Sequence, residues 1–410
     1  MSTETKPETT PEPGKAPAAE SPATTRSFGA DWIPSIKTTI AAIILALLIG
    51  AVLIAFSSQA VIETLPYFFS YPWDFFSEAG HAIGESYWAL ITGSVGSTSA
   101  LATTLVRSAP LICAGLGVTL AFRAGLFNIG AQGQLILGAL AAGYVGFTWD
   151  LPPGIHLLAA LVAGLLGGAL WGGIAGVLKA RTGAHEVITT IMLNYVAIQV
   201  VLFGLRSDFL RQEGSSQPIS KVLTPIARVP GILDPFGIPS IRLHYGFVLA
   251  LVMAVVVSWF LFKTTKGFEL RAAGFNLTAA RYAGMSASGS IILAMTLSGA
   301  LAALGGSMEV LGTVPQMSND ISSGFGFNAI ALALLAGNRP FGIVLAALLF
   351  GALRTGGGLM QVQTGIPLDL LFFIQALVIM FVAAPGLVRS IWRLRAPRTP
   401  TGTAVDGARA

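Results

Sequence analysis

Long apolar runs, separated by short polar segments, dominate this chain. The hydrocarbon core of a bilayer requires about 20 apolar residues of helix, and a backbone exposed to lipid must satisfy its hydrogen bonds within a helix or a closed barrel. Only 10% of the residues are charged, against about 25% in soluble domains. The sequence therefore predicts an all-α polytopic integral membrane protein. Its eight long runs cover residues 38–56, 99–121, 129–147, 156–178, 187–204, 246–262, 289–311 and 368–388.

Two further apolar runs, 326–337 and 340–353, are too short to cross a bilayer as regular helices. We expect them to be half-spanning or tightly turned, which gives about ten transmembrane segments, some of them broken. Basic residues are enriched in the cytoplasmic loops of membrane proteins. Both termini are therefore predicted to be cytoplasmic, because this places most of the basic loops inside.

The predicted topology divides the chain into three parts. Residues 1–35 are rich in Pro, Thr, Glu and Ala and are expected to be a disordered cytoplasmic tail. Residues 36–388 form the transmembrane domain. Residues 389–410 carry four Arg before position 399 and one after it, and are expected to be a basic cytoplasmic tail.

Three longer connections lie within the transmembrane domain. Segment 58–97 is aromatic and acidic and is predicted to be an external interfacial helix, with contact to an external partner as the alternative. Segment 206–245 contains five prolines and is expected to be a folded external cap. Loop 263–288 is the longest predicted cytoplasmic connection.

A polar stretch, 122–134, interrupts the apolar pattern. It contains one Arg, one Asn, two Gln and three Gly. Lipid cannot satisfy such groups, so a broken polar backbone at this depth must be buried in protein or line a wet path. Transporters build substrate routes from discontinuous helices of this kind. The stretch makes the chain a candidate translocation protein.

A second polar stripe consists of Glu186, Thr190 and Asn194, which lie four residues apart. Such a stripe must face the bundle interior or a wet cavity. We weigh two interpretations, a solute pathway and hydrogen bonding between helices. For Glu186 there is a third, because a carboxylate is favourable at the start of a helix.

Small residues repeat at i+4 spacing on two of the runs. Such faces let helix backbones approach closely, so we interpret both as packing surfaces. They comprise Gly164, Gly168, Gly172 and Gly176 on one run and Ala294, Ser298, Ala302 and Gly306 on the other.

The cytoplasmic loop is predicted to contain two short helices. The first, 268–273, is expected to stop at Gly274. Asn276 is expected to cap the second, 277–283, which Gly284 ends. They form either a docking knob for a cytoplasmic protein or an anchor on the membrane surface.

Motifs for enzymatic chemistry are missing from the sequence. It contains neither the phosphate loop Gly-x-x-x-x-Gly-Lys-Ser/Thr nor the nucleophile motif Gly-x-Ser-x-Gly. The four His lie far apart, without metal-ligand spacing, and Cys113 is the single cysteine. The net charge of +5 is placed at predicted helix ends, so no nucleic-acid surface is expected. We expect a non-enzymatic protein without a metal.

The sequence resembles the permease subunits of ABC importers. It is similar to the branch that serves ribose-type sugars and nucleosides, and most similar to general nucleoside permeases. The resemblance extends from about residue 95 to 388. It is carried by Phe-Asn-Ile-Gly-Ala-Gln-Gly-Gln at 127–134, His-Glu-Val-Ile-Thr-Thr-Ile-Met-Leu-Asn-Tyr at 185–195, and the segments 267–284, 324–331 and 337–342.

This resemblance implies partners that no spacing argument supplies. Two such permeases, identical or homologous, pair among the lipids of a prokaryotic cell membrane (the inner or plasma membrane). A cytoplasmic ABC ATPase, which holds ATP and Mg²⁺, docks on their loops, and an extracytoplasmic binding protein delivers a small neutral solute. The permease itself is expected to need no cofactor. Its coupling residues would be Glu269, Leu270, Arg271, Gly274, Asn276, Ala280, Arg281, Tyr282 and Gly284.

A nucleoside site needs aromatic faces for the base, and amides or hydroxyls for the base edges and ribose. Few charges line the predicted path, which suits a neutral solute. We expect the pathway to involve Phe127, Asn128, Gln132, Gln134, Glu186, Thr190, Asn194, Phe327, Asn328 and Gln375.

The sequence departs from the family pattern at two places. Gln132 stands where the family often has Glu, which argues against an essential charge there. Asn276-Leu277 replaces the usual Asn-Pro of the coupling loop, and Pro at the first position of a helix is favourable but dispensable.

Three functions follow from this comparison. The first is nucleoside import by an ABC importer, and the second is import of a monosaccharide such as ribose or galactose by the same machine. The third is an ion-coupled secondary transporter, which would need intramembrane carboxylates. Glu186 is the only carboxylate that the sequence analysis places near such a position.

Overall fold

The computed structural model describes residues 32–237 and 241–392. The predictions for 1–31 and 393–410 lie outside the described residues. Helix α1 already begins at Trp32, within the segment assigned to the tail. The α-helices are α1 (Trp32–Ser57), α2 (Gln59–Thr64), α3 (Pro72–Val95), α4 (Thr98–Arg123), α5 (Ala131–Thr148), α6 (Ile155–Thr182), α7 (Glu186–Arg206), α8 (Gly246–Lys263), α9 (Thr265–Phe275), α10 (Leu277–Tyr282), α11 (Ala287–Met308), α12 (Phe325–Leu335), α13 (Pro340–Thr364), α14 (Leu368–Ala383) and α15 (Pro385–Ile391).

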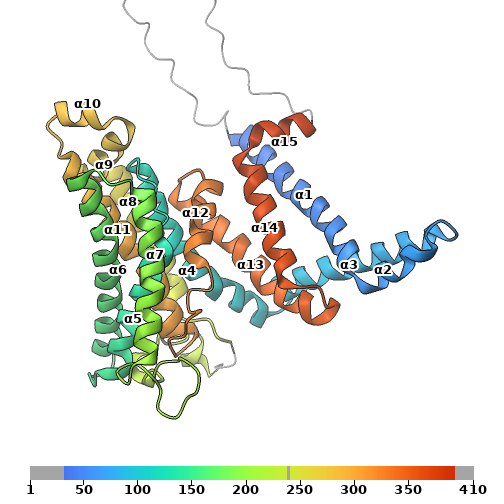
Figure 1. Cartoon of the computed structure of the whole chain (residues 1–410), viewed down its shortest axis with the longest axis horizontal. Coiled ribbons are helices and arrows are strands. Elements are labelled where there is room, and N and C mark those ends of the chain that lie inside the picture. The colour runs from blue at the N-terminus through green and yellow to red at the C-terminus, as the bar shows by residue number, and fades with distance from the viewer. Residues whose placement is uncertain (1–31, 238–240, 393–410) are drawn as a thin grey trace, which may run out of the picture.

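The helices form a main bundle with a smaller group beside it (Figure 1). Helices α4 to α8 and α11 make up the bundle, α12 and α13 lie next to it, and α1 packs on α14. Helix α3 runs crosswise to α1 and contacts α13. The start of α1 and helix α15 lie at the same end of the molecule as α9 and α10 (Figure 1); the cytoplasmic location of both termini stays a prediction.

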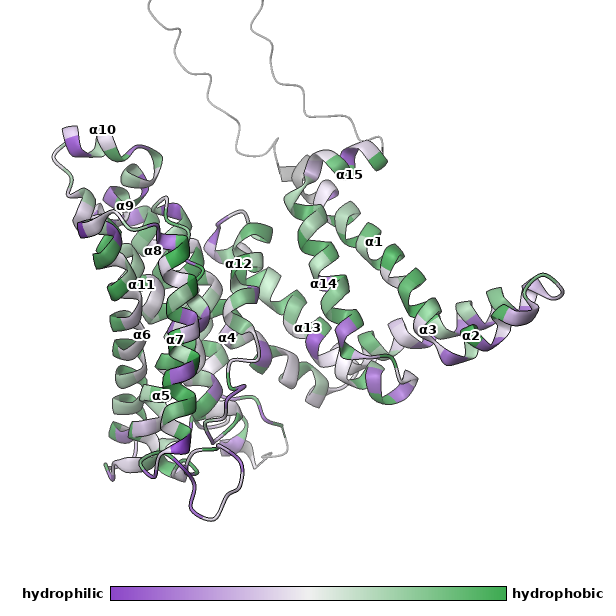
Figure 2. Cartoon of the chain, in the orientation of Figure 1, coloured by the Kyte–Doolittle hydropathy of each residue, from purple (hydrophilic) through white to green (hydrophobic). Residues whose placement is uncertain are grey.

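Seven helices of the described chain are long and apolar enough to cross a membrane, and eight if α14 and α15, bent by 92°, form one broken span. Figure 2 shows hydrophobic residues along these helices and hydrophilic residues gathered near α10 and in the loops at the opposite end. This is the architecture of a multi-pass membrane protein. The count of about ten segments is not confirmed, although α12, with 11 residues, is short as predicted.

The prediction of a short helix at 340–353 is wrong, because α13 continues to Thr364 and has 25 residues. Three glycines, at 356–358, lie within this longer helix. Two of them permit close packing: a Cβ on Gly356 would lie 2.0 Å from the Leu90 carbonyl oxygen, and one on Gly357 would lie 2.3 Å from Leu371 Cδ2. Tertiary contacts with α3 and α14 therefore keep these glycines within the helix.

The glycine face on α6 is a packing surface, as the sequence predicts, and the structure shows that its partner is α11. A Cβ on Gly168 would lie 2.1 Å from the Ala303 Cβ, and one on Gly172 would lie 2.4 Å from the Met295 carbonyl oxygen. On α11, Gly306 approaches the backbone of Leu135 in α5 in the same way. In lipid the hydrophobic effect does not draw helices together, so van der Waals contact of this kind stabilises their association.

The segment between α7 and α8 forms an ordered connection in its described part. Two isolated β-bridges close it, Arg211 with Ser220 and Gly231 with His244, and short 3₁₀ turns occupy Pro225–Ala227 and Asp234–Phe236. Prolines begin or follow these turns, as expected from their fixed φ. Pro239 lies outside the described residues.

His244 connects this segment to the bundle. Its ring is buried, Nδ1 accepts a hydrogen bond from the Gly246 amide at 3.1 Å, and Nε2 lies 3.5 Å from the Thr313 hydroxyl. The neutral tautomer with its proton on Nε2 satisfies both contacts. Burial lowers the pKa of His244 from 6.5 to about 4.

We expect acid to weaken this connection. Between pH 6.5 and about 4 the unfolded state binds a proton on His244 that the folded state does not, so stability falls as the pH drops through this range, by at most about 3 kcal/mol. Melting of the purified permease at pH 7.5, 5.5 and 4.5 measures the effect. A His244→Gln variant should lose less stability on acidification, whereas His81→Gln, exposed on α3, should behave as the wild type. Equal slopes in all three proteins would contradict the assignment.

Candidate functional site

The polar stretch predicted at 122–134 forms a break between α4 and α5. Helix α4 ends at Arg123, and α5 starts at Ala131. Gly125 has φ of 72°, in the left-handed region that glycine adopts readily. A Cβ at Gly125 would lie 2.9 Å from the Gly274 Cα. The break therefore lies directly against helix α9.

Asn128 is the centre of a hydrogen-bond network inside this break. Its side chain is completely buried. The amide nitrogen donates to Gln134 Oε1 at 2.9 Å and to the Ser298 hydroxyl at 2.8 Å, and Oδ1 accepts from the Gly130 amide at 2.9 Å. Asn128 thus joins the start of α5 to α11.

Asn194 joins the same break to α7. Its Oδ1 accepts from the Gly133 amide at 2.8 Å, and its Nδ2 donates to the Ile129 carbonyl at 2.9 Å. The Gly133 amide is one of the N–H groups that the first turn of α5 leaves without a helical partner, and the Ile129 carbonyl belongs to the break just before that helix. Asn194 lies about 12 Å along α7 from its first residue, so the network is well inside the bundle.

Removing the Asn194 amide should destabilise the bundle. Asn194→Leu leaves the buried Gly133 amide without a partner and removes the bond to the Ile129 carbonyl, and we expect a loss of roughly 2 kcal/mol. Melting of the purified protein in detergent measures this loss. Gln199→Leu, on the exposed side of the same helix, is the matched control, and equal stability of the two variants would contradict the capping role.

Gln132 connects the two short helices α5 and α12. Its Oε1 accepts from the Gly326 amide at 3.0 Å in the first turn of α12, and its Nε2 donates to the Ser322 hydroxyl. The side chain uses both its carbonyl and its NH₂ group. An uncharged Gln meets this double requirement.

The remaining predicted pathway residues do not join this network. Phe127 stacks on Phe122 with centroids 4.8 Å apart and is partly exposed, as is Phe327 in α12. Asn328 is half-buried, and Gln375 is buried on α14, away from the break. The structure therefore brings together Asn128, Gln132, Gln134 and Asn194, with Thr190 packed beside them against Gly130, and a role of any of them in solute contact stays a prediction.

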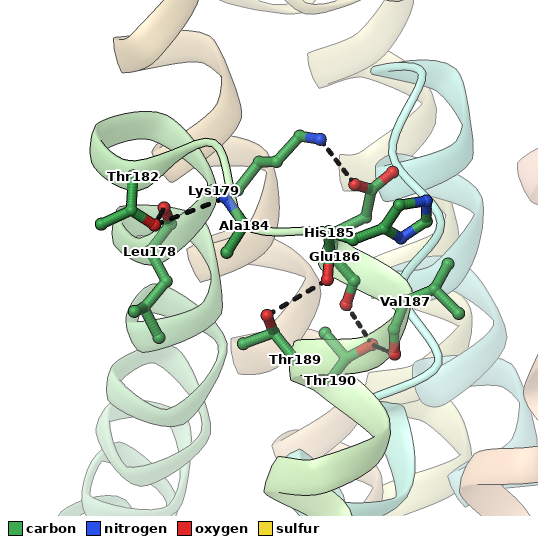
Figure 3. A network of polar contacts seen from close by, with 9 residues as sticks. All are labelled: Leu178, Lys179, Thr182, Ala184, His185, Glu186, Val187, Thr189 and Thr190. Carbon is green, nitrogen blue, oxygen red and sulfur yellow. Dashed lines mark hydrogen bonds and ion pairs between the residues drawn. The ribbon is translucent and has the colours of Figure 1, made fainter.

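Glu186 and Thr190 lie at the corner between α6 and α7 (Figure 3). Glu186 forms an ion pair with Lys179 of α6 at 2.8 Å. The Thr190 hydroxyl donates to the Glu186 carbonyl at 2.7 Å within the same helix. Thr190 is buried and Glu186 half-buried. The ion pair fixes the helix corner.

A group of intramembrane charges was missed by the sequence analysis. Glu309 follows the last residue of α11 and begins a π-helical turn, Glu309–Thr313. It lies within the span 287–313 and is only 7% exposed, so the statement that Glu186 is the only carboxylate near the membrane is wrong. Arg107 of α4 and Arg354 of α13 interact electrostatically with it. The sequence did carry a signal for this group, because each of the three residues is a single charge within a largely apolar segment, and such charges are rare inside membranes.

The two helices predicted in loop 263–288 partly match their prediction. Asn276 Oδ1 accepts from the amides of Thr278 and Ala279, both at 3.0 Å, and so caps α10. Gly284 has φ of 79° and follows the end of α10. The expected stop at Gly274 is wrong, since α9 continues to Phe275. A Cβ on Gly274 would lie 2.4 Å from the Arg123 carbonyl oxygen. Glycine is therefore needed here for close packing and not to end the helix.

The predicted coupling residues divide into two groups. Leu270 and Ala280 are buried, and Arg271 lies over the Phe262 ring at 5.1 Å, so these three hold the two helices on the bundle. The second group lies at the surface. Asn276, Arg281, Tyr282 and Gly284 are exposed, whereas Glu269 is half-buried and pairs with Lys266. Two aromatic rings that the prediction did not include, Phe268 and Phe275, are exposed beside them.

A recess of about 740 Å³ lies beside these helices. Its lining includes Lys263, Phe268, Glu269, Gly284 and Met285. With exposed aromatic rings around a concave, mixed-charge surface, this end of the molecule is suited to receive a protein partner.

A broken helix, a buried amide network and a protruding pair of short helices are features expected of a membrane translocation subunit. Residues 100–383 match the family described as the branched-chain amino acid transport system permease component. The chain belongs to this family of permeases, which are translocation components rather than enzymes.

Named relatives cover most of the chain. A guanosine ABC transporter permease of Bacillus subtilis is 40% identical over 76% of this chain and 89% of its own length. A nucleoside ABC transporter permease of Lactococcus lactis is 34% identical over 74% of this chain and 84% of its own. A glucose ABC transporter permease of Haloferax volcanii is 38% identical over 73% and 80%. No solved structure matches the chain significantly.

Proposed function

We propose that the chain moves nucleosides into a prokaryotic cell across its plasma membrane, as one permease subunit of an ATP-driven importer. The observation that carries the proposal is the 40% identity to a guanosine permease along 89% of that protein. The uncharged amides of the α4–α5 break support it, because they suit a neutral solute better than an ion. Alternating access of the bundle would carry the solute.

The proposed importer has three kinds of component besides this chain. A cytoplasmic ABC ATPase that binds ATP and Mg²⁺ would dock on α9 and α10, where Tyr282 and Phe275 are 90% and 89% exposed. A second, homologous permease would pair with this chain in the membrane. An extracytoplasmic binding protein would deliver the solute to the opposite end. The permease would contribute no cofactor of its own.

Uptake of labelled guanosine, uridine, ribose and glucose tests the substrate class. Cells that lack this chain but retain the ATPase are compared with cells in which it is restored. Loss of nucleoside uptake alone, recovered on restoration, is the expected result. Loss of sugar uptake alone would overturn the nucleoside assignment.

Monosaccharide import is the second candidate. It is favoured by the relative from Haloferax volcanii, whose described solute is glucose and whose identity to this chain is 38%. The same uptake experiment separates the two, since each predicts loss of a different labelled solute.

A further inference from the structure

Charged side chains from three helices meet in the outer half of the bundle. Arg354 lies about 21 Å along α13 from its cytoplasmic start, and Arg107 lies about 24 Å along α4 from its cytoplasmic end. Both act electrostatically on Glu309. The hydrocarbon core is about 30 Å thick, so the group faces the side from which an imported solute enters.

Glu309 has binding capacity that the protein leaves unused. The residue is 7% exposed, and its Oε2 atom has no hydrogen-bond partner. A buried carboxylate oxygen without a donor is costly. Among the described residues, no ion pair within 4.0 Å joins Glu309 to either arginine. The carboxylate is thus held near two guanidinium groups without direct contact.

The arginines are held by the backbone instead. Arg354 donates from Nη1 to the Ser323 carbonyl at 2.9 Å, and Arg107 donates from Nη1 to the Arg354 carbonyl at 3.5 Å. The Arg354 guanidinium also lies 4.6 Å from the centre of the Phe325 ring. These contacts orient the guanidinium groups and leave several of their N–H donors available.

Unusual backbone surrounds the same place. Glu309 begins the π-helical turn, and π-helical turns occur frequently at functional sites. Ser323, which accepts the Arg354 bond, has φ of 44°, one of two non-glycine residues in the described chain with positive φ. Backbone strain of this kind is retained at sites where surrounding contacts enforce it.

The formal charges of the group balance. Arg354 also interacts electrostatically with Asp320, a carboxylate that is exposed in the connection between α11 and α12. Two arginines and two carboxylates give no net charge. An anionic solute would be repelled by the two carboxylates and a cationic solute by the two arginines. A neutral, hydroxyl-rich solute can donate hydrogen bonds to the carboxylates and accept them from the arginines.

We propose that Glu309, Arg107 and Arg354 form a subsite for the vicinal hydroxyl groups of the solute, the ribose diol of a nucleoside. The proposal rests on the function proposed above. A ribose hydroxyl donates to Oε2 of Glu309, and the guanidinium groups donate to the hydroxyl oxygens. Such charge-assisted bonds are stronger than neutral ones. Phe325 positions Arg354 and does not contact the solute.

Sugar-modified nucleosides test the subsite in the complete importer. Uptake of a ribonucleoside and of its 2′,3′-dideoxy analogue is measured in proteoliposomes that contain the ATPase, both permeases and the binding protein. Glu309→Gln should lower ribonucleoside uptake about tenfold relative to the dideoxy analogue, as expected for loss of one charge-assisted bond. The binding protein is the same in both samples, so its own preference cancels in this ratio. Glu213→Gln, on the exposed external segment, is the matched control.

The outcomes separate the subsite from the proposed function. An unchanged ratio in Glu309→Gln, or an equal loss for both solutes, would overturn the subsite and leave nucleoside import standing. A wild-type importer that takes up neither nucleoside would overturn the proposed function and the subsite with it. If Glu309→Gln does not assemble, Arg354→Lys is the variant to measure. It keeps the positive charge but loses the planar guanidinium with its several donors, so it should show the same selective loss of ribonucleoside uptake.

Discussion

Replacing Gly172 with Ala should destabilise the permease by about 3 kcal/mol, although alanine is the better helix former. The added Cβ would lie 2.4 Å from the Met295 carbonyl oxygen and 3.1 Å from the Gly299 Cα, both backbone atoms of α11. Backbone atoms cannot rotate away as the end of a side chain can. Relief therefore requires α6 and α11 to separate, and these two helices form the most extensive contact of the bundle.

The adjacent glycine provides the control for this prediction. A Cβ on Gly173 would meet only the Thr296 hydroxyl, at 3.1 Å, and that hydroxyl can rotate. Gly173→Ala should therefore leave the unfolding free energy unchanged or slightly higher. Denaturant unfolding of both variants in mixed micelles, with the yield of folded protein, gives the comparison. Equal stability would show that α6 and α11 are not held by close backbone packing.

Arg281→Glu should abolish solute uptake without unfolding the permease. Arg281 is exposed on α10 and forms no ion pair or side-chain hydrogen bond within the described chain. Helix α10 itself is fixed by the Asn276 cap and the buried Ala280. A reversed charge at a protein interface costs several kcal/mol through like-charge repulsion. We expect a loss of uptake of at least about tenfold, with ATP hydrolysis no longer linked to transport.

Arg242→Glu is the matched control, since Arg242 is exposed on the external segment and the charge change is the same. It should leave uptake near the wild-type rate. Uptake and ATP hydrolysis are measured together in proteoliposomes, and melting confirms that both variants fold. Normal uptake in Arg281→Glu would remove α10 from the docking surface.

Several features were predictable because the interactions that fix them are local. Asn276 bonds to amides two and three residues ahead, so the residue type and its position were enough to predict the cap of α10. The shared face of the i+4 glycines on α6 was equally predictable, because helical geometry alone places Gly164, Gly168, Gly172 and Gly176 on one side. The pairing of this face with α11 needed the tertiary structure.

Where a glycine was predicted to end a helix, at Gly274, the prediction failed. Gly274 lies inside α9, and the backbone of Arg123 packs so closely against it that an added Cβ would lie 2.4 Å from the Arg123 carbonyl oxygen. The residue type is the same for a helix stop and for a close approach. Only the neighbouring chain distinguishes them.

By itself, the sequence determined the class of the protein. Apolar runs and the polar break at 122–134 require a helical membrane bundle with an interrupted helix, because lipid offers no hydrogen bonds to backbone or amide groups. The tertiary structure decided what the polar groups meet. It joined Asn128 to Ser298 and Gln132 to Gly326, and it brought Glu309 near Arg107 and Arg354. These partners lie on different helices, and their meeting depends on packing that no local pattern encodes.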